Sequence, residues 1–168
     1  FGHSAFIGVG AFTAGLVEAQ MGSAPAPLLL AAGLVSAAAV CGILSALIAY
    51  PILRLRGTFF AIAMMGVCHV CAEVTNNVDF FQGSMGLNYP AIAPASVDPA
   101  SFFYELFLVG ASLILLVSWQ IRKSRFGAGL LSIREDEDTA RMLGVPTERY
   151  KRLAFVVSAV LTGVMGVI

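Results

Sequence analysis

The chain contains 168 residues, of which 58% are hydrophobic and only 12% are charged. Ordinary soluble domains are about 45–50% apolar and about 25% charged, so this composition excludes a typical soluble fold. Ten lysines and arginines balance ten aspartates and glutamates, which excludes a basic nucleic-acid-binding protein and an acidic disordered tail. The basic residues are unevenly placed, because none occurs in residues 1–53 or 57–121.

Five apolar stretches follow one another along the chain. A bilayer core of about 30 Å requires roughly 20 helical residues, and each stretch approaches or reaches that length. The pattern predicts an all-α integral membrane protein, a single domain with about five complete or partial transmembrane helices and one further cytoplasmic helix. The predicted membrane helices span residues 4–21, 27–53, 58–75, 102–121 and 153–168. Because the chain begins with Phe1 and stops within the fifth stretch, we expect a fragment of a longer protein.

The basic residues predict how these helices are oriented. Short loops rich in lysine and arginine stay in the cytoplasm, so Arg54 and Arg56 place the end of the second helix inside. Residues 76–101 then form an outer, periplasmic loop, and residues 122–152 return to the cytoplasm. Four residues of the outer loop are candidates for contact with a binding protein or for gating: Gly83, Ser84, Met85 and Gly86. Ordinary loop chemistry explains them equally well.

The segment 122–152 is unusually polar, with eight of the ten basic residues and five of the ten acidic ones. Ser132, followed three positions later by Glu135, predicts a capping box at the start of a helix. Residues 135–138 are all acidic, which suits the positive end of a helix dipole. Glu137 is placed to pair with Arg141 one turn later.

The end of this cytoplasmic helix is also predicted. Gly144 is expected to terminate it in a left-handed conformation, and Thr147 is expected to cap the next helix. Exposed Ile133, Met142 and Leu143 suit a groove on a partner protein. The alternative, equally supported by the spacing alone, is a solvated connecting loop with ordinary helix caps.

Four sequence blocks resemble those of a known family. They are FGHSAFIGVGAFTAG at residues 1–15, LRLRG at 53–57, QGSMGL at 82–87 and SRFGAGLLSIREDEDTARMLGVPTERYKRLAF at 124–155. In this order, and over nearly the whole chain, they look like the LivM-type permease subunit of bacterial branched-chain amino acid ABC importers. The resemblance implies a multi-pass protein of the bacterial inner membrane that translocates branched-chain amino acids and is not itself an enzyme.

The resemblance also implies partners. These are a second permease subunit, two cytoplasmic ABC ATPases, a periplasmic substrate-binding protein and membrane lipid, with no nucleic acid. The chain lacks a phosphate-binding loop of the Gly-x-x-x-x-Gly-Lys-Ser/Thr type. ATP and Mg²⁺ are therefore expected on the partner ATPases, and no cofactor is expected in this chain.

A degenerate signature supports a role for segment 122–152. Asp138, Thr139, Ala140 and Gly144 match the spacing of the Glu-Ala-Ala-x-x-x-Gly signature of importer permeases, with Asp in place of Glu and Thr in place of the first Ala. In that family a groove of the ATPase receives this helix, so the resemblance implies a coupling loop. The predicted ATPase-coupling residues are Arg134, Glu135, Asp136, Glu137, Asp138, Thr139, Ala140, Leu143 and Gly144.

The first apolar stretch contains candidates for the translocation path. They are Gly2, His3, Phe6 and Gly10. Small residues in membrane helices permit a substrate-facing break or, as the alternative, close packing of two helices. The cluster of Cys68, His69 and Cys71 is interpreted as packing, and no metal site is predicted, because no second ligand pair stands at zinc spacing.

Two other functions remain open from the sequence. Importers for urea or short amides use permeases that resemble this chain, so the substrate is the least specified part of the interpretation. An ion-coupled secondary transporter is the alternative from a different class. The acidic cytoplasmic segment and the lack of a clear mid-membrane carboxylate argue against that class. A membrane enzyme is disfavoured because no cluster of nucleophile, base or metal ligands emerges.

Overall fold

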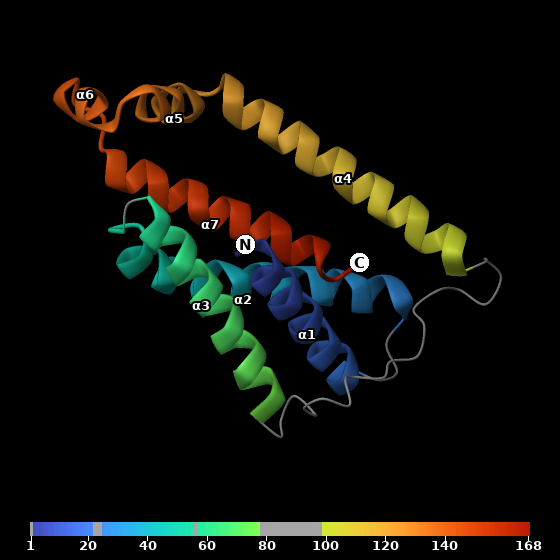
Figure 1. The fold of residues 1–168 in the computed structure, drawn as a ribbon. Coiled ribbons are helices and arrows are strands. Elements are labelled where there is room, and N and C mark those ends of the chain that lie inside the picture. Colours follow the sequence, from blue (N-terminus) through green and yellow to red (C-terminus); the bar gives the residue numbers. More distant parts are fainter. Residues whose placement is uncertain (1, 22–24, 56, 78–98) are drawn as a thin grey trace.

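The computed structural model describes residues 2–21, 25–55, 57–77 and 99–168. Within these residues the chain forms seven α-helices and no strand, which confirms the predicted all-α class (Figure 1). The helices are α1 (His3–Met21), α2 (Ala26–Ile52), α3 (Thr58–Asn77), α4 (Pro99–Lys123), α5 (Arg125–Glu135), α6 (Glu137–Met142) and α7 (Thr147–Met165). The outer-loop candidates, residues 83–86, lie outside the described residues.

Four of the described helices, α1 to α4, are long and apolar enough to cross a membrane. They coincide with the first four predicted stretches. The fifth predicted stretch, 153–168, overlaps α7, which ends at Met165 and is not among these candidates. This helix begins at Thr147, six residues earlier than predicted, and its first two turns contain the charged residues 148, 149, 151 and 152.

The packed centre of the molecule consists of α1, α2 and α7. Gly10 of α1 lies directly on the backbone of Gly163 in α7: a Cβ atom added to Gly10 would sit 2.8 Å from the Gly163 carbonyl carbon. Cys41 of α2 packs on the other side of Gly163, and its thiol donates to the Phe6 carbonyl oxygen over 3.6 Å. Glycine permits this approach because it has no side chain to hold the helices apart.

Helices α2 and α7 run antiparallel along this centre. The start of α2 meets the end of α7 at Gly33 and Val167, and Gly42 meets Val160 nearer the middle. Ser45 is completely buried in α2, and its hydroxyl donates to the carbonyl oxygen of Gly42 over 2.9 Å. A buried hydroxyl in an apolar helix therefore has a partner within its own helix, as membrane burial requires.

Helix α4 stands apart from this centre (Figure 1). None of its membrane-length window is buried, and its exposed apolar side chains include Phe107, Leu113 and Leu116. So large an apolar surface is not stable against water and requires lipid or another membrane helix around it. Near the end of α4, the Lys123 ammonium lies 3.6 Å from the ring centroid of Trp119. An aromatic ring beside a cation is typical of the membrane surface.

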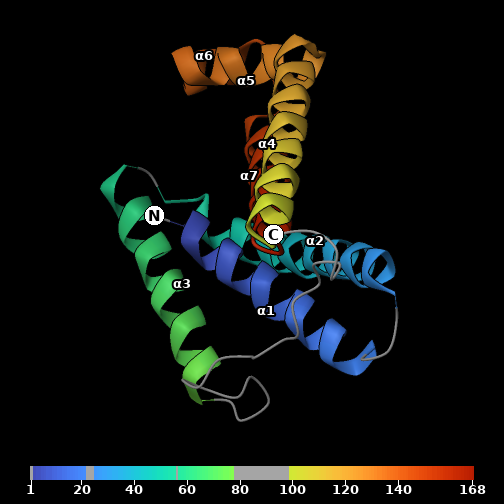
Figure 2. The same ribbon diagram turned by 90° about the vertical axis from the view of Figure 1, so that its right-hand side faces the viewer.

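Helices α5 and α6 lie across one end of the molecule, between the end of α4 and the start of α7 (Figure 2). The end of α2, with Arg54 just beyond it, is at this same end, because Arg54 and residues of α6 and α7 line one cavity. Among the described residues, this cavity brings Arg54 together with Arg141, Lys151 and Arg152, although they are far apart in the sequence.

The contact between α1 and α7 leads to a stability prediction. We expect Gly10→Ala to lower the free energy of unfolding by about 1–3 kcal/mol, because the added methyl forces two backbones apart. Gly8→Ala is the matched control, since a Cβ atom at Gly8 meets no atom within 4 Å. Thermal unfolding in detergent measures both, and equal stability of the two variants would contradict the predicted contact.

Candidate functional site

The polar segment begins with a sharp turn from α4 into α5. Ser124 is the N-cap of α5: its hydroxyl oxygen accepts a hydrogen bond from the amide of Gly127 over 3.2 Å. Gly127 is buried against the main chain of Ile121 and Arg122. Helix α5 was not predicted, although a serine at the start of an apolar run is an available cap signal.

The predicted capping box of Ser132 and Glu135 is wrong. Both residues belong to α5, and the Ser132 hydroxyl donates to the carbonyl oxygen of Gly129 within that helix over 2.8 Å. The helical run that starts at Ser124 continues through these positions, so the amide groups that a capping box would satisfy are already bonded within α5.

Asp136 separates α5 from α6 and caps the second helix. Its extended backbone breaks the helix, and its carboxylate accepts hydrogen bonds from the amides of Asp138 over 3.1 Å and Thr139 over 3.3 Å. The Thr139 hydroxyl donates to the same carboxylate. These bonds favour the ionised form, the Thr139 hydroxyl most strongly, and hold the pKa of Asp136 below its usual value of 3.8.

Gly144 ends α6 in the left-handed conformation, as predicted, with φ of +83°. The amide of Val145 donates to the carbonyl oxygen of Ala140 over 3.0 Å. The amide of Gly144 donates to the carbonyl oxygen of Arg141 over 3.1 Å. This pair of bonds is a Schellman motif. It satisfies two carbonyl groups at the end of α6 and reverses the chain toward α7.

Charged side chains connect α6 to α7. Glu137 forms the predicted ion pair with Arg141, at 3.6 Å, and a second pair with Lys151 of α7. The Lys151 and Glu137 side chains are only 30% and 23% exposed, so water screens this pair less than a fully exposed one. Ala140 is buried beneath the same helix. These contacts therefore hold α6 in a fixed position against α7.

Thr147 does not cap α7 through its side chain, contrary to the prediction. Pro146 occupies the cap position, and Thr147 is the first residue of the helix. The Thr147 side chain is buried, and its hydroxyl oxygen accepts a hydrogen bond from the Arg141 guanidinium over 3.4 Å. In a cap, the Thr147 hydroxyl oxygen would instead accept a hydrogen bond from the first free amides of α7.

The outer tip of α6 is apolar and exposed. Met142 is 88% exposed and Leu143 is 77% exposed, whereas Ile133 in α5 is half-buried. The nine predicted coupling residues form one continuous region, the end of α5 followed by α6 and its terminal turn. The arrangement is a short rigid knob with an apolar tip, suited to a groove on a partner.

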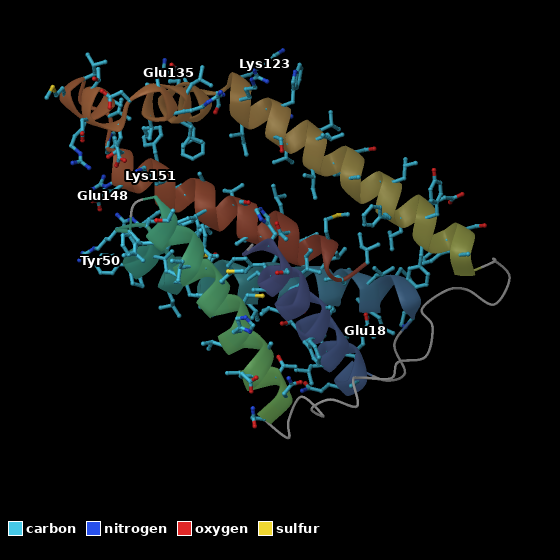
Figure 3. All side chains as sticks on the ribbon, viewed as in Figure 1. Glu18, Tyr50, Lys123, Glu135, Glu148 and Lys151 are labelled. Atoms are coloured by element: carbon cyan, nitrogen blue, oxygen red, sulfur yellow. The ribbon has the colours of Figure 1, made fainter. Side chains whose placement is uncertain are left out.

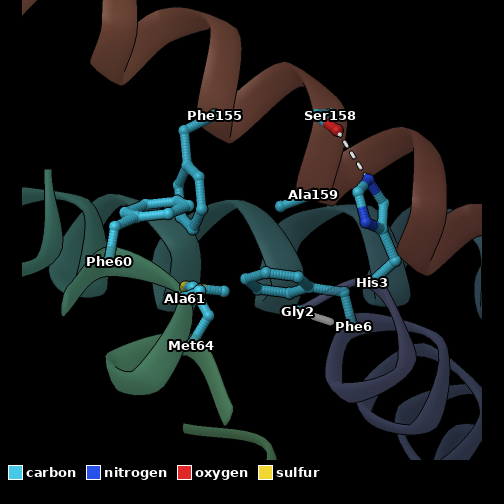
Figure 4. A pocket seen from close by; sticks show the side chains of 9 residues that line it. All are labelled: Gly2, His3, Phe6, Phe60, Ala61, Met64, Phe155, Ser158 and Ala159. Carbon is cyan, nitrogen blue, oxygen red and sulfur yellow. Dashed lines mark hydrogen bonds between the residues drawn. The ribbon is translucent and has the colours of Figure 1, made fainter. Parts of the chain in front are cut away.

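The structure brings three of the four predicted path residues together in a cavity of about 200 Å³ (Figure 4). Gly2, His3 and Phe6 of α1 line it, with Phe60, Ala61 and Met64 of α3 and Phe155, Ser158 and Ala159 of α7. The rings of Phe6 and Phe155 meet edge to face at 5.9 Å between centroids. His3 Nε2 and Ser158 Oγ are 3.4 Å apart and form a polar edge.

Gly10, the fourth predicted path residue, does not line this cavity. It lies at the contact with Gly163, which is the close-packing alternative. The sequence interpretation also missed Phe60, Phe155 and Ser158. Only the packing of α3 and α7 against α1 brings them to His3, so no local pattern identifies them.

The capping role of Asp136 leads to a pH prediction. A carboxyl group with a lowered pKa in the folded state stabilises the fold above its unfolded pKa, and that contribution is lost as pH falls through the folded value. We therefore expect the Asp138 and Thr139 amides to resist hydrogen exchange at neutral pH and to lose protection only below pH 3.8, the usual carboxyl value. Asp136→Asn should make the protection independent of pH, and a pH-dependent loss in that variant would contradict the assignment.

Comparisons with known proteins identify the family of this chain. The family model for the permease component of branched-chain amino acid transport systems matches residues 1–168. Similar curated relatives include the high-affinity branched-chain amino acid transport system permease proteins LivM of Salmonella typhimurium and Escherichia coli, at 28% and 27% identity over 98% of this chain. The chain covers 44% of the length of each relative. No solved structure matches it. Because the family model covers the whole chain, the protein belongs to the permease components of branched-chain amino acid transport systems.

Proposed function

We propose that the protein is part of the permease subunit of an ATP-driven importer that moves branched-chain amino acids across the bacterial inner membrane. The observation that carries this proposal is α6, a helix with an exposed apolar tip at Met142 and Leu143, in a chain of the permease family. In this proposal α6 is the coupling helix, and its tip enters a groove on a cytoplasmic ATPase.

The contacts around α6 support transmission of movement into the membrane. The Glu137–Lys151 ion pair and the Arg141–Thr147 hydrogen bond connect α6 to the first turns of α7. Helix α7 in turn lies against α1 at Gly163 without intervening side chains. A displacement of α6 by the ATPase is thus passed to α7 and α1 through contacts that leave little room for sliding.

The cavity between α1, α3 and α7 supports an aliphatic substrate. Three phenylalanines, Met64 and two alanines are among its nine lining residues, and His3 and Ser158 supply a polar edge. A volume of about 200 Å³ is large enough for a branched aliphatic group. Aromatic and thioether walls offer few hydrogen bonds to urea or a short amide, so the lining favours a branched-chain amino acid over those substrates.

The partners in this proposal follow from what the chain contains and what the family does. A second permease subunit completes the translocation path beside the bare surface of α4. Two ATPases in the cytoplasm bind ATP and Mg²⁺, and a periplasmic binding protein delivers the amino acid. We assign no cofactor to this chain.

The coupling role predicts a specific effect at Gly144. We expect Gly144→Val in the intact permease to abolish uptake while the protein remains in the membrane. A β-branched residue at φ of +83° costs about 1–2 kcal/mol of backbone strain and displaces the turn. Reconstituted transporter should also lose stimulation of ATP hydrolysis by the binding protein.

Gly144→Asn is the matched control, because asparagine tolerates the left-handed conformation and a Cβ atom here meets no atom within 4 Å. This variant should retain most uptake. Normal transport by Gly144→Val would rule out the proposed role of the turn, whereas equal loss in both variants would indicate that glycine is required for a reason other than backbone conformation.

The proposed orientation predicts opposite accessibility for the ends of two helices. We expect a cysteine at Asn77, the last residue of α3, to react from the periplasm, and a cysteine at Asp136 to react only from the cytoplasm. The background is a variant in which the three native cysteines are replaced by alanine. A membrane-impermeant maleimide applied to intact cells and to inverted vesicles measures both, and same-side labelling would overturn the topology.

A further inference from the structure

A polar cavity of about 280 Å³ lies where the end of α2 meets α6 and the start of α7. Six charged side chains line it: Arg54, Glu137, Arg141, Glu148, Lys151 and Arg152. Four are cationic and two are anionic, which leaves a surplus of two positive charges. Figure 3 shows Tyr50, Glu148 and Lys151, which all line the cavity, gathered at this end of the bundle.

Two of the four cations, Arg54 and Arg152, differ from the others in their partners. Glu137 already pairs with Lys151 and Arg141. Arg54 stacks over the Tyr50 ring, 4.2 Å from its centroid, and donates to the tyrosine hydroxyl. Arg152 donates through Nε to the carbonyl oxygen of Glu148 over 3.3 Å. Within the part of the chain that the structure describes, neither Arg54 nor Arg152 forms an ion pair.

The residues beside the cavity indicate that it lies at the depth of the lipid headgroups. Arg54 follows two residues after the end of α2, the most apolar of the four candidate spans. Tyr50 in the last turns of α2 adds an aromatic ring of the kind enriched at lipid headgroups. The cavity thus opens at the depth of the headgroups on the side where the chain's basic residues gather.

Two guanidinium groups at that depth match one kind of ligand. Guanidinium binds phosphate oxygens through paired, charge-assisted hydrogen bonds, and basic pockets between transmembrane helices bind anionic headgroups. We propose that this cavity binds the phosphate of an anionic phospholipid, with Arg54 and Arg152 as its ligands. The bound headgroup joins α2 to α7 beside the Glu137–Lys151 ion pair and stabilises the contact between α6 and α7.

Lipid retention tests this proposal without any transport measurement, so its outcome does not depend on the proposed function. The intact permease is placed in nanodiscs of phosphatidylcholine, with or without phosphatidylglycerol. Native mass spectrometry then counts retained lipid, and thermal unfolding gives Tm. We expect phosphatidylglycerol to be retained and to raise Tm. The double variant Arg54→Gln/Arg152→Gln should lower its retention at least about tenfold, the effect of losing a charge-assisted bond, and remove the rise in Tm.

Lys123→Gln is the matched control, because Lys123 is a cation of the same polar segment that lies on Trp119, outside the cavity. It should keep both lipid effects, and Arg54→Lys should keep part of the retention, since lysine retains the charge without the paired geometry. Three results would overturn the proposal: undiminished retention in the double variant, an equal loss in Lys123→Gln, or an equal rise in Tm from inorganic phosphate alone.

Discussion

The contact between the backbones of α1 and α7 at Gly10 and Gly163 determines the rest of the arrangement. In a membrane the hydrophobic effect does not drive two helices together, so close van der Waals contact has to hold them. Cys41 of α2 packs against the same glycine, which fixes three helices at one point. The cavity lined by His3 and Phe155 lies next to this contact, and its shape follows from how closely α1 approaches α7.

A second constraint acts on the polar end of the molecule. Backbone amides and carbonyls at helix ends require partners, and the chain supplies them locally at each break between α4 and α7. Ser124 and Asp136 provide acceptors at two helix starts, and the Schellman motif at Gly144 provides donors at one helix end. With its ends satisfied and Glu137 paired to Lys151, the six-residue α6 keeps a defined shape that so short a helix does not have in isolation.

The features that could be predicted from the sequence are those encoded by adjacent residues. Apolar length identified the first four membrane helices, and glycine identified the left-handed turn at position 144. The start of the cytoplasmic helix was misplaced because Ser132 and Asp136 both qualify as caps, and only the upstream turn at Ser124 decides between them. The cavity was predicted only on its α1 side, since Phe60 and Ser158 reach His3 through tertiary packing that no local spacing encodes.

The turn at Gly144 has a consequence for how such a helix can change over evolutionary time. Its two hydrogen bonds join main-chain atoms of residues 140, 141, 144 and 145, so these bonds depend on the conformation of the backbone and not on which side chains those residues have. Only glycine, or less readily asparagine, preserves the required φ. The turn therefore keeps its geometry with aspartate and threonine at residues 138 and 139, so the conformation of the terminal glycine describes such a helix better than a short signature written in amino-acid letters.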